Sequence, residues 1–463
     1  MCLEFSHLMK YIYLLLLIFA SKFTYGQENH NHSEHATFIE KSNIVRCSSV
    51  EYELELQKKY PERATHTEFE TWMADKINVD QKSNRVQNPN NVYNIPVVIH
   101  VIHDGDAIGT NENISTARVL SQITVLNQDF RRMFGTNGFN SNSVGADIEI
   151  EFCAAQQTPS GAPTNGIDRI NMGVDQWALR ADAENMKAQT QWDPTKYFNV
   201  WVVYFTDDAA FPTNEGGLND LLGYAQFPET TLAGVSSNTN ADTDGVILDY
   251  RCFGSSQIAA GPYFSAYNLG RTITHEIGHS LGLRHIWGDN TSCIVNATDS
   301  NKDYCPDTPA AKQSNANCAI VYNSCPSAPG DDMTENYMDY SRDSCLNTFT
   351  INQKTRMRTI MNNSPRRLSL RTSNVCQALS NSAFNTLDEF KLFPNPANDF
   401  INISTASIID NYEIINSIGQ KILSVNVISD VDLSINISGL SKGVYFLKVY
   451  NGSATSVKKF IKN

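Results

Sequence analysis

The sequence is short of basic side chains: 36 Lys and Arg stand against 49 Asp and Glu, and the formal net charge is −13 at pH 7. Phosphates repel a protein of this sign, so nucleic acid and anionic membrane surfaces are not expected as partners. Beyond the N-terminus no apolar run is long enough to cross a bilayer, so no transmembrane segment is expected there. The chain also has no Cys-x-x-Cys pair, which disfavours a zinc finger as the role of its ten cysteines.

One short apolar run is present, and it lies at the N-terminus. The letters YIYLLLLIFA follow Lys10, and the small residue Gly26 precedes Gln27. A basic residue, an apolar run of about ten residues and a small residue at a cleavage point are typical of a secretory signal peptide. We therefore expect a signal peptide over residues 1–26. Export would take the chain to an oxidising compartment, where its cysteines can form disulfides.

The segment HEIGHSLGLRH, from His275 to His285, is the strongest functional signal in the chain. His275 and His279 are four residues apart, so a helix places both rings on one face, one turn apart. Gly282 can adopt a positive φ, which lets the helix end and brings His285 back as a third ligand. Three protein ligands leave one zinc position open, which is the catalytic rather than the structural arrangement. Glu276 stands beside the first ligand and can act as a base on a water molecule there.

The extended motif resembles the metzincin metallopeptidases. NYMDY supplies the methionine of a Met-turn, Met338, and Tyr340 follows two residues later. HEIGHSLGLRHIWGD, CPDTP, ENYMDYSRDSC and FTINQKTRM narrow the resemblance to the pappalysins, the relatives of ulilysin, over roughly residues 90–365. The resemblance implies a zinc endopeptidase in which Glu276 is the base and Tyr340 helps to stabilise the oxyanion.

The same resemblance implies two disulfides near the zinc site, Cys293–Cys325 and Cys318–Cys345. Cys305, in CPDTP, departs from the pappalysin pattern and makes the local cysteine count odd. Three other cysteines remain as its candidate partners: Cys153, Cys252 and Cys376.

A latency switch and a specificity residue are also expected. Cys47 stands alone in the segment RCSS, where its thiolate can occupy the open zinc position of a precursor. An unused or disulfide-bonded cysteine is the alternative. In pappalysins an aspartate at the place of Asp343 lies at the base of the pocket for the residue after the scissile bond. It would pair there with Arg or Lys. A surface aspartate paired with Arg342 is the alternative.

The resemblance further associates a calcium site with the acidic loop around CPDTP. Hard oxygens are the ligands that calcium prefers, and the loop offers four such residues: Asp299, Asp303, Asp307 and Thr308. A solvated acidic loop without a metal is the alternative. Zinc and calcium are therefore the expected cofactors.

The pattern of residues divides the rest of the chain into domains. The polar, charged segment 27–88 lies where a propeptide belongs, and its part from 51 to 76 has helical character. Residues 89–375 contain segments rich in β-branched and aromatic residues, an amphipathic helix at 116–133 and the zinc helix from 268 to 283. This mixture predicts an α+β, metzincin-like catalytic domain: a mixed sheet with an active-site helix and a loop-rich lower half.

A polar linker at 376–388 leads to a segment of different character at 389–463. Apolar and polar residues alternate there, with turns about every ten residues, which predicts a small β-sandwich. The letters LFPNPAND, GVYFLKVY and KKFIK resemble the C-terminal sorting domain of type IX secretion. This resemblance implies that secretion machinery as a partner, and a protein that is released or stays at the cell surface. A carbohydrate- or protein-binding module is the alternative.

These features together predict a secreted zinc endopeptidase that acts on proteins or peptides and cuts before Arg or Lys. A zinc-stabilised, non-catalytic surface adhesin or binding protein is the rival from another class. Glu276 disfavours it, because a structural zinc site does not require a base. Among enzymes an astacin-like metzincin is the near alternative, but the DTP segment and the cysteine pattern favour a pappalysin.

Overall fold

The computed structural model describes the chain in seven stretches: residues 38–82, 92–232, 241–293, 303–377, 390–417, 419–451 and 454–463. The expected signal peptide lies outside these stretches, as does most of the expected linker. Within the described residues, no helix combines the length and the apolar character that crossing a bilayer requires.

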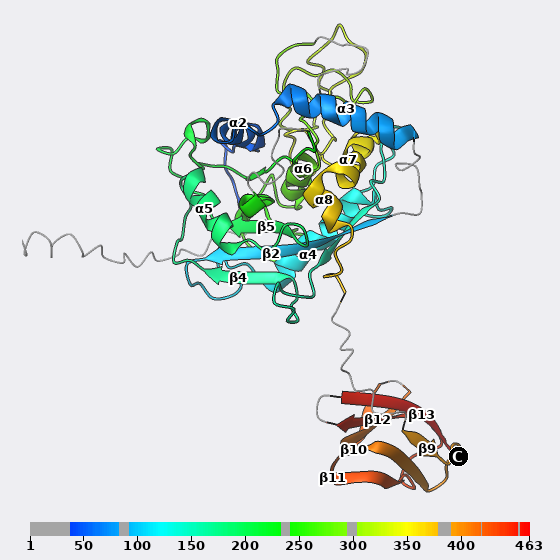
Figure 1. Cartoon of the computed structure of the whole chain (residues 1–463). Coiled ribbons are helices and arrows are strands. Elements are labelled where there is room, and N and C mark those ends of the chain that lie inside the picture. The colour runs from blue at the N-terminus through cyan, green and yellow to red at the C-terminus, as the bar shows by residue number, and fades with distance from the viewer. Residues whose placement is uncertain are drawn as a thin grey trace, which may run out of the picture.

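The expected catalytic domain is built around a six-stranded sheet whose strands are all parallel except the edge strand β6 (Figure 1). The strand order is β3-β2-β5-β7-β6, and β4 also pairs with β2. The bounds are β2 Tyr93–His103, β3 Ile150–Ala154, β4 Ile167–Asn171, β5 Phe198–Val203, β6 Gly223–Ala225 and β7 Val246–Asp249. Apolar patterns predict β2, β3, β5 and β7. They miss β4 and β6, because IDRIN is largely polar and GYA is very short.

Two helices of this part, α4 and α7, begin with a side-chain cap. The side chain of Ser115 accepts a hydrogen bond from the backbone of Arg118 at the start of α4, and Thr350 with Gln353 forms a capping box at the start of α7. The α-helices here are α4 Thr116–Phe130, α5 Arg180–Thr190, α6 Arg271–Ser280, α7 Ile351–Asn363 and α8 Pro365–Leu370. Short 3₁₀ helices are η1 Thr213–Glu215, η2 Ala241–Thr243 and η3 Tyr250–Cys252.

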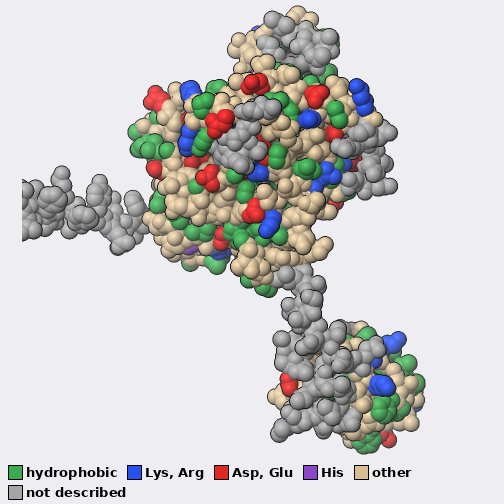
Figure 2. All heavy atoms as spheres, viewed as in Figure 1, with side chains coloured by type: hydrophobic (Ala, Val, Ile, Leu, Met, Phe, Trp, Pro, Cys, Tyr) green, Lys and Arg blue, Asp and Glu red, His purple; other side chains and the backbone are tan. Residues whose placement is uncertain are grey.

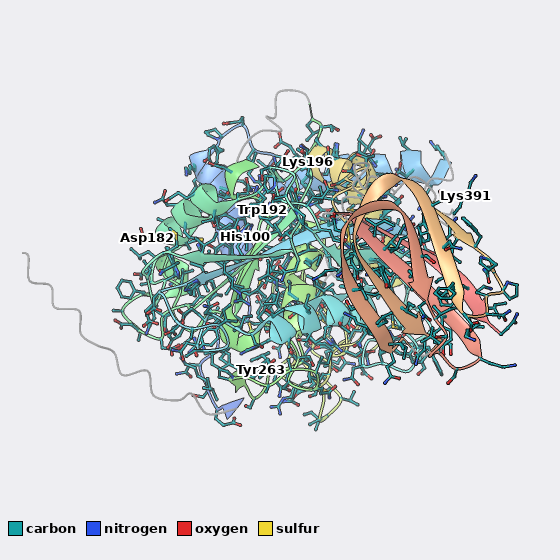
Figure 3. All side chains as sticks on the ribbon, turned by 90° about the horizontal axis from the view of Figure 1, so that it is seen from below. His100, Asp182, Trp192, Lys196, Tyr263 and Lys391 are labelled. Atoms are coloured by element: carbon teal, nitrogen blue, oxygen red, sulfur yellow. A yellow bond between two sulfur atoms is a disulfide. The ribbon has the colours of Figure 1, made fainter. Side chains whose placement is uncertain are left out.

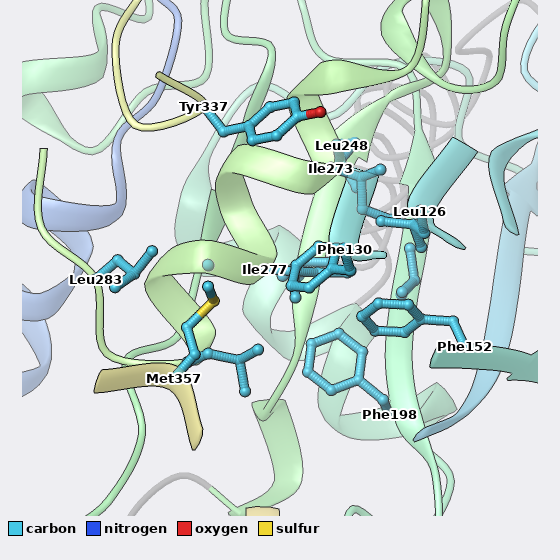
Figure 4. Packing of buried hydrophobic residues seen from close by; sticks show 14 of the residues in the cluster. Leu126, Phe130, Phe152, Phe198, Leu248, Ile273, Ile277, Leu283, Tyr337 and Met357 are labelled. Atoms are coloured by element: carbon cyan, nitrogen blue, oxygen red, sulfur yellow. The ribbon is translucent and has the colours of Figure 1, made fainter. Parts of the chain in front are cut away.

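The zinc-motif helix α6 is anchored by the apolar side of its own sequence. Figure 4 shows Ile273 and Ile277 of α6 together with Phe130 of α4 and Phe152 of β3, all of them buried in one core. The rings of Phe130 and Phe152 meet edge to face with their centroids 4.9 Å apart. Because these apolar side chains hold α6 in place, its histidines are not needed for packing.

The segment before the expected catalytic domain is folded onto that domain. The short strand β1, Phe38–Ile39, pairs with β8, Tyr263–Phe264, and α3 lies across α7 (Figure 1). The expected helix at 51–76 is instead two helices, α2 Ser49–Lys59 and α3 His66–Lys82. Pro61 lies between them, and proline removes the backbone donor that a continuous helix would need.

The C-terminal part is a separate antiparallel β-sandwich with its own core. The strands are β9 Lys391–Phe393, β10 Phe400–Asn416, β11 Lys421–Asn436, β12 Gly443–Asn451 and β13 Ala454–Lys462. The first part of β10 pairs with β9 and the later part with β12. Ile401, Ile414, Leu447 and Phe460 are among the side chains buried in its core.

One view of the surface shows charges of both signs, and one histidine outside the zinc motif, His100, is buried. On the face drawn in Figure 2, acidic and basic side chains are interspersed. His100 of β2, labelled beside Trp192 in Figure 3, is buried and hydrogen-bonds to Asp168 and Asn199 at 3.0 and 2.9 Å. This histidine is therefore satisfied inside the fold.

Candidate active site

The three histidines of the motif converge on one point. His275 and His279 lie on α6, and His285 returns to them after the chain turns at Gly282, where φ is +84°. The Nε2 atom of His279 lies 3.2 Å from that of His275 and 3.1 Å from that of His285. A Cβ atom on Gly282 would stand 2.8 Å from Ile360, so the turn requires glycine both for its φ and for its space.

The partners of the other ring nitrogens, the Nδ1 atoms, show which nitrogen of each ring carries the hydrogen. Nδ1 of His275 faces the carbonyl oxygen of Tyr337 at 2.7 Å, and Nδ1 of His279 faces that of Leu283 at 3.0 Å. A carbonyl only accepts, so both Nδ1 atoms donate and both Nε2 atoms carry lone pairs. Burial, and then the neighbouring histidines, lowers the pKa of both rings and favours this neutral form. Converging imidazole lone pairs of this kind fit a zinc ion.

The third ring is oriented by a carboxylate. Nδ1 of His285 hydrogen-bonds to Asp289, and the ring stacks on Trp287 with centroids 4.4 Å apart. A carboxylate behind a metal-ligating histidine fixes its orientation and strengthens it as a ligand. Asp289 is a site residue that the sequence did not single out, although it lies four residues after the third histidine.

Met338, the expected Met-turn residue, lies against α6, and Tyr340 lies beside two of the three histidines. Met338 is fully buried, and its sulfur would be 2.5 Å from a Cβ atom on Gly278, so the glycine of α6 makes room for it. The ring of Tyr340 lies 4.9 Å from that of His285 and 5.7 Å from that of His275, measured between centroids.

Glu276 is fully buried, and two residues of the N-terminal segment 27–88 hold its side chain. Its Oε2 atom accepts a hydrogen bond from the hydroxyl of Ser49 at 2.7 Å and a longer one from the thiol of Cys47 at 3.5 Å. Its Oε1 atom has no hydrogen-bond partner among the described residues. Burial raises the pKa of Glu276 to about 7, while the hydrogen bond from Ser49 lowers it.

Cys47 completes a four-residue cluster with the three histidines. The Sγ atom of Cys47 and one ring nitrogen of each histidine all lie within 4.8 Å of one another, and all four residues are buried. Burial, and then the charge of Glu276, raises the pKa of the thiol well above its ordinary value. Ser49, which also accepts a hydrogen bond from the backbone of Ala225, was missed by the sequence.

Asp343 is buried at the start of α6, so the expected alternative of a surface aspartate paired with Arg342 is wrong. Its Oδ2 atom accepts hydrogen bonds from the backbone N–H groups of Leu269 and Arg271 at 2.9 and 3.2 Å. Its Oδ1 atom lies 3.8 Å from the guanidinium of Arg46. Arg46 immediately precedes Cys47, and its guanidinium also lies over the ring of Tyr267, 4.9 Å from the centroid.

Comparisons with known proteins now bear on this geometry. A sequence profile of the family described as pregnancy-associated plasma protein-A matches residues 182–362. An extracellular metalloprotease of Colletotrichum graminicola is 30% identical over 268 residues, which cover 58% of this chain and 76% of that protein. The chain belongs to this pappalysin family. A profile of the secretion system C-terminal sorting domain matches residues 391–463 of this chain.

Solved structures of mirolysin are similar to this chain in sequence and fold. Mirolysin in complex with a compound is 34% identical, with a TM-score of 0.51 over 63% of this chain and 100% of that one. A promirolysin mutant of Tannerella forsythia is 33% identical, with a TM-score of 0.50 over 64% of this chain and 90% of that one. The protein is therefore a secreted zinc metalloendopeptidase of metzincin fold with a C-terminal sorting domain. Membership of a peptidase family decides against the non-catalytic rival.

The disulfides of this pappalysin correct one expectation. Cys293–Cys325 and Cys318–Cys345 are bonded, the two pairs that the resemblance implied. Cys305 has none of the three partners offered for it: it is a free, buried thiol, as is Cys252. Cys153 and Cys376 are bonded to each other instead, which ties the first residue of the expected linker to the catalytic domain.

The oxygens expected to hold calcium are only partly brought together. The hydroxyl of Thr308 donates to Asp303 at 2.7 Å, but Asp307 turns to the start of α7. There it accepts hydrogen bonds from the hydroxyl of Thr350 and the backbone of Asn352 at 2.7 and 2.8 Å. Asp299 lies outside the described residues, so calcium in this loop stays a prediction.

Proposed function

We propose that the chain is the latent precursor of an endopeptidase in which His275, His279 and His285 hold the catalytic zinc. The observation that carries this proposal is the convergence of three Nε2 atoms whose rings are oriented from behind. A zinc ion bound by these histidines would act as a Lewis acid: it would lower the pKa of water toward neutrality and polarise a peptide carbonyl.

The chain's own residues would supply the proton transfers. Glu276 takes a proton from the attacking water and then gives it to the leaving amine. Both transfers need a carboxylate next to the first zinc ligand, and Glu276 directly follows His275 on α6. The phenol of Tyr340, beside the zinc ligands His275 and His285, donates a hydrogen bond to the developing oxyanion.

Latency would come from the segment 27–88 acting as a propeptide. The Cys47 sulfur lies within reach of the same point as the three imidazoles, where it would take the fourth ligand position and exclude water. A thiol that binds zinc loses its proton, so the raised pKa of the free thiol is no obstacle. Ser49 adds a second block, because its hydroxyl occupies the Oε2 atom of Glu276 that the reaction needs.

Cleavage before Arg or Lys is supported by the partner of Asp343. The precursor places Arg46 in an ion pair with this buried carboxylate, next to the cysteine at the zinc site. A substrate arginine or lysine would replace Arg46 after the propeptide leaves. An apolar side chain would leave the carboxylate buried and unpaired, which costs several kcal/mol by the usual order of magnitude.

The sorting domain would direct export through the type IX machinery, and the mature enzyme would then be released or remain at the cell surface. The catalytic domain would span 89–375, with Cys376 bonded to it.

Replacing Glu276 tests the catalytic proposal. Glu276→Ala should retain the fold and one zinc per chain after propeptide removal, yet lose nearly all hydrolysis of a peptide that contains Arg after the cut. Glu215→Ala, which removes an exposed carboxylate of η1, is the matched control and should keep full activity. Substantial hydrolysis by the zinc-loaded Glu276→Ala enzyme would refute the assignment.

A further inference from the structure

A second group of carboxylates gathers away from the zinc motif, at the carboxyl ends of β2 and β4. Asp104 follows β2 directly, and Glu112 lies further along the same connection to α4. Asp175 lies on the connection from β4 to α5. β2 and β4 are parallel neighbours, so their carboxyl ends meet at one edge of the sheet. One carboxylate oxygen from each of the three residues lies within 4.8 Å of the other two.

Glu112 is the fully buried member of this cluster. Its side chain is fully buried, and its Oε1 atom accepts a hydrogen bond from the backbone of Asp104 at 3.1 Å. Its Oε2 atom has no hydrogen-bond partner among the described residues. Burial raises the pKa of this carboxyl to about 8, and the charges of Asp104 and Asp106 act in the same direction. A buried carboxylate oxygen that faces two other carboxylates is unfavourable without a cation.

The nearby arginine is directed elsewhere. Arg169 of β4 donates to the side chain of Asn113 at 2.6 Å and to the carbonyl of Ile114 at 2.8 Å. No ion pair joins Glu112 to a basic side chain in the described part of the chain. Glu112 therefore lies among the neighbouring carboxylates without a basic side chain of its own in the described residues.

We propose that Asp104, Glu112 and Asp175 bind a calcium ion that joins the β2–α4 and β4–α5 connections. Carboxylate oxygens on irregular loops are the ligands that calcium prefers, whereas zinc and copper favour imidazole and thiolate. Calcium is abundant where a secreted protein works, and sites in extracellular proteins bind it at roughly 0.1–1 mM. This site is separate from the acidic loop around Asp307 and does not depend on the proposed catalytic roles.

The test compares thermal melting with and without calcium. The full chain carries Glu276→Ala to prevent self-cleavage, and zinc is kept constant. About 1 mM calcium, the range of extracellular sites, should raise the melting temperature of this parent. Glu112→Gln in the same background should lose that rise. Without calcium it should melt at or above the parent, because the substitution removes the carboxylate repulsion.

Two controls separate the site from other calcium effects. Asp182→Asn removes an exposed charge on α5 (labelled in Figure 3), and Asp307→Asn alters the loop expected to bind calcium near the zinc site. Asp182→Asn should keep the whole calcium-dependent rise of the parent, and Asp307→Asn should keep the part of the rise that Glu112→Gln removes. Calorimetric titration with calcium should show one ion fewer bound by Glu112→Gln than by Asp182→Asn.

Two results would overturn the proposal: a parent whose melting temperature ignores calcium, or a Glu112→Gln variant that responds as the parent does. If Glu112→Gln fails to fold, Asp175→Asn, which alters a half-buried member, gives the same readout. None of these outcomes bears on zinc binding or catalysis, so failure here leaves the proposed function standing.

Discussion

Glu70 of α3 is expected to hold the propeptide on the catalytic domain. Its buried carboxylate accepts hydrogen bonds from both outer nitrogens of Arg356 at 2.9 and 3.0 Å, and from Arg284 at 3.1 Å. Arg284 lies in the zinc motif and Arg356 on α7, so this one carboxylate of the propeptide bonds to both the zinc motif and α7. Glu70→Gln keeps the shape of the side chain and removes its charge.

The magnitude follows from leaving two buried guanidinium groups without their counter-charge. Breaking a buried ion pair by removing one partner costs about 3–5 kcal/mol. Arg356 keeps the carbonyl of Gly282 as an acceptor at 2.9 Å, which favours the lower end of that range. A loss of about 3–5 kcal/mol raises the opening equilibrium of α3 by roughly 100- to 4,000-fold.

The same ion pairs make the attachment sensitive to acid. Burial alone would raise the pKa of Glu70, but the charges of Arg356 and Arg284 outweigh it and lower the pKa from 4.5. A carboxylate with a lowered folded-state pKa stabilises above its unfolded pKa, and that contribution is lost as the pH falls through the folded value. The propeptide should therefore loosen below pH 4.5 in the wild type, and Glu70→Gln should lack this step.

Hydrogen exchange of the α3 amides measures the opening directly. The precursor carries Glu276→Ala so that it stays intact, and exchange is followed at neutral pH. Glu70→Gln should speed exchange in α3 by at least about 100-fold, whereas Asp75→Asn, an exposed acid on the same helix, should not. Equal exchange in the two variants would show that the ion pairs do not hold the helix.

Three further changes have definite expected results. Cys47→Ala should shorten the lag before the precursor activates itself in a peptide assay, whereas an unchanged lag would remove the latency switch. Asp343→Asn should reduce the enrichment of Arg and Lys after the cut in a peptide-library profile without removing zinc; an unaltered profile would show that the pocket lies elsewhere. Gly282→Ala should destabilise the fold by about 2–5 kcal/mol, from positive φ and from crowding against Ile360, and lower zinc content. Gly161→Ala, at φ +82° with open space around it, should suffer only the φ term, and equal melting temperatures would contradict the crowding.

The local parts of the site could be predicted because their geometry is set by short spacings. His275 and His279 share a helix face by periodicity, and Gly282 reverses the chain within a few residues. The strands β2 and β5 were visible because each is a nearly continuous run of buried β-branched and aromatic residues. Such patterns depend only on residues that are close in the sequence, so they can be recognised without knowing the rest of the fold.

The contacts made by distant residues were not predictable in the same way. Ser49 meets Glu276 across 227 residues, and Glu70 meets Arg356 across 286, so no periodic pattern links them. The free thiol of Cys305 was missed because an odd cysteine count suggests a partner, whereas burial alone keeps this thiol inside the core. One signal was available for Arg46, since a basic residue directly precedes the expected switch cysteine.

X-ray absorption at the zinc edge of the intact precursor tests the central claim most directly. The account predicts three nitrogen ligands at about 2.0 Å and one sulfur at about 2.3 Å, the usual zinc distances. The sulfur should be Cys47, and the signal should vanish both in Cys47→Ser and after removal of the propeptide, while the three nitrogens remain. A precursor whose zinc has no sulfur ligand, or an active enzyme that still has one, would contradict the account.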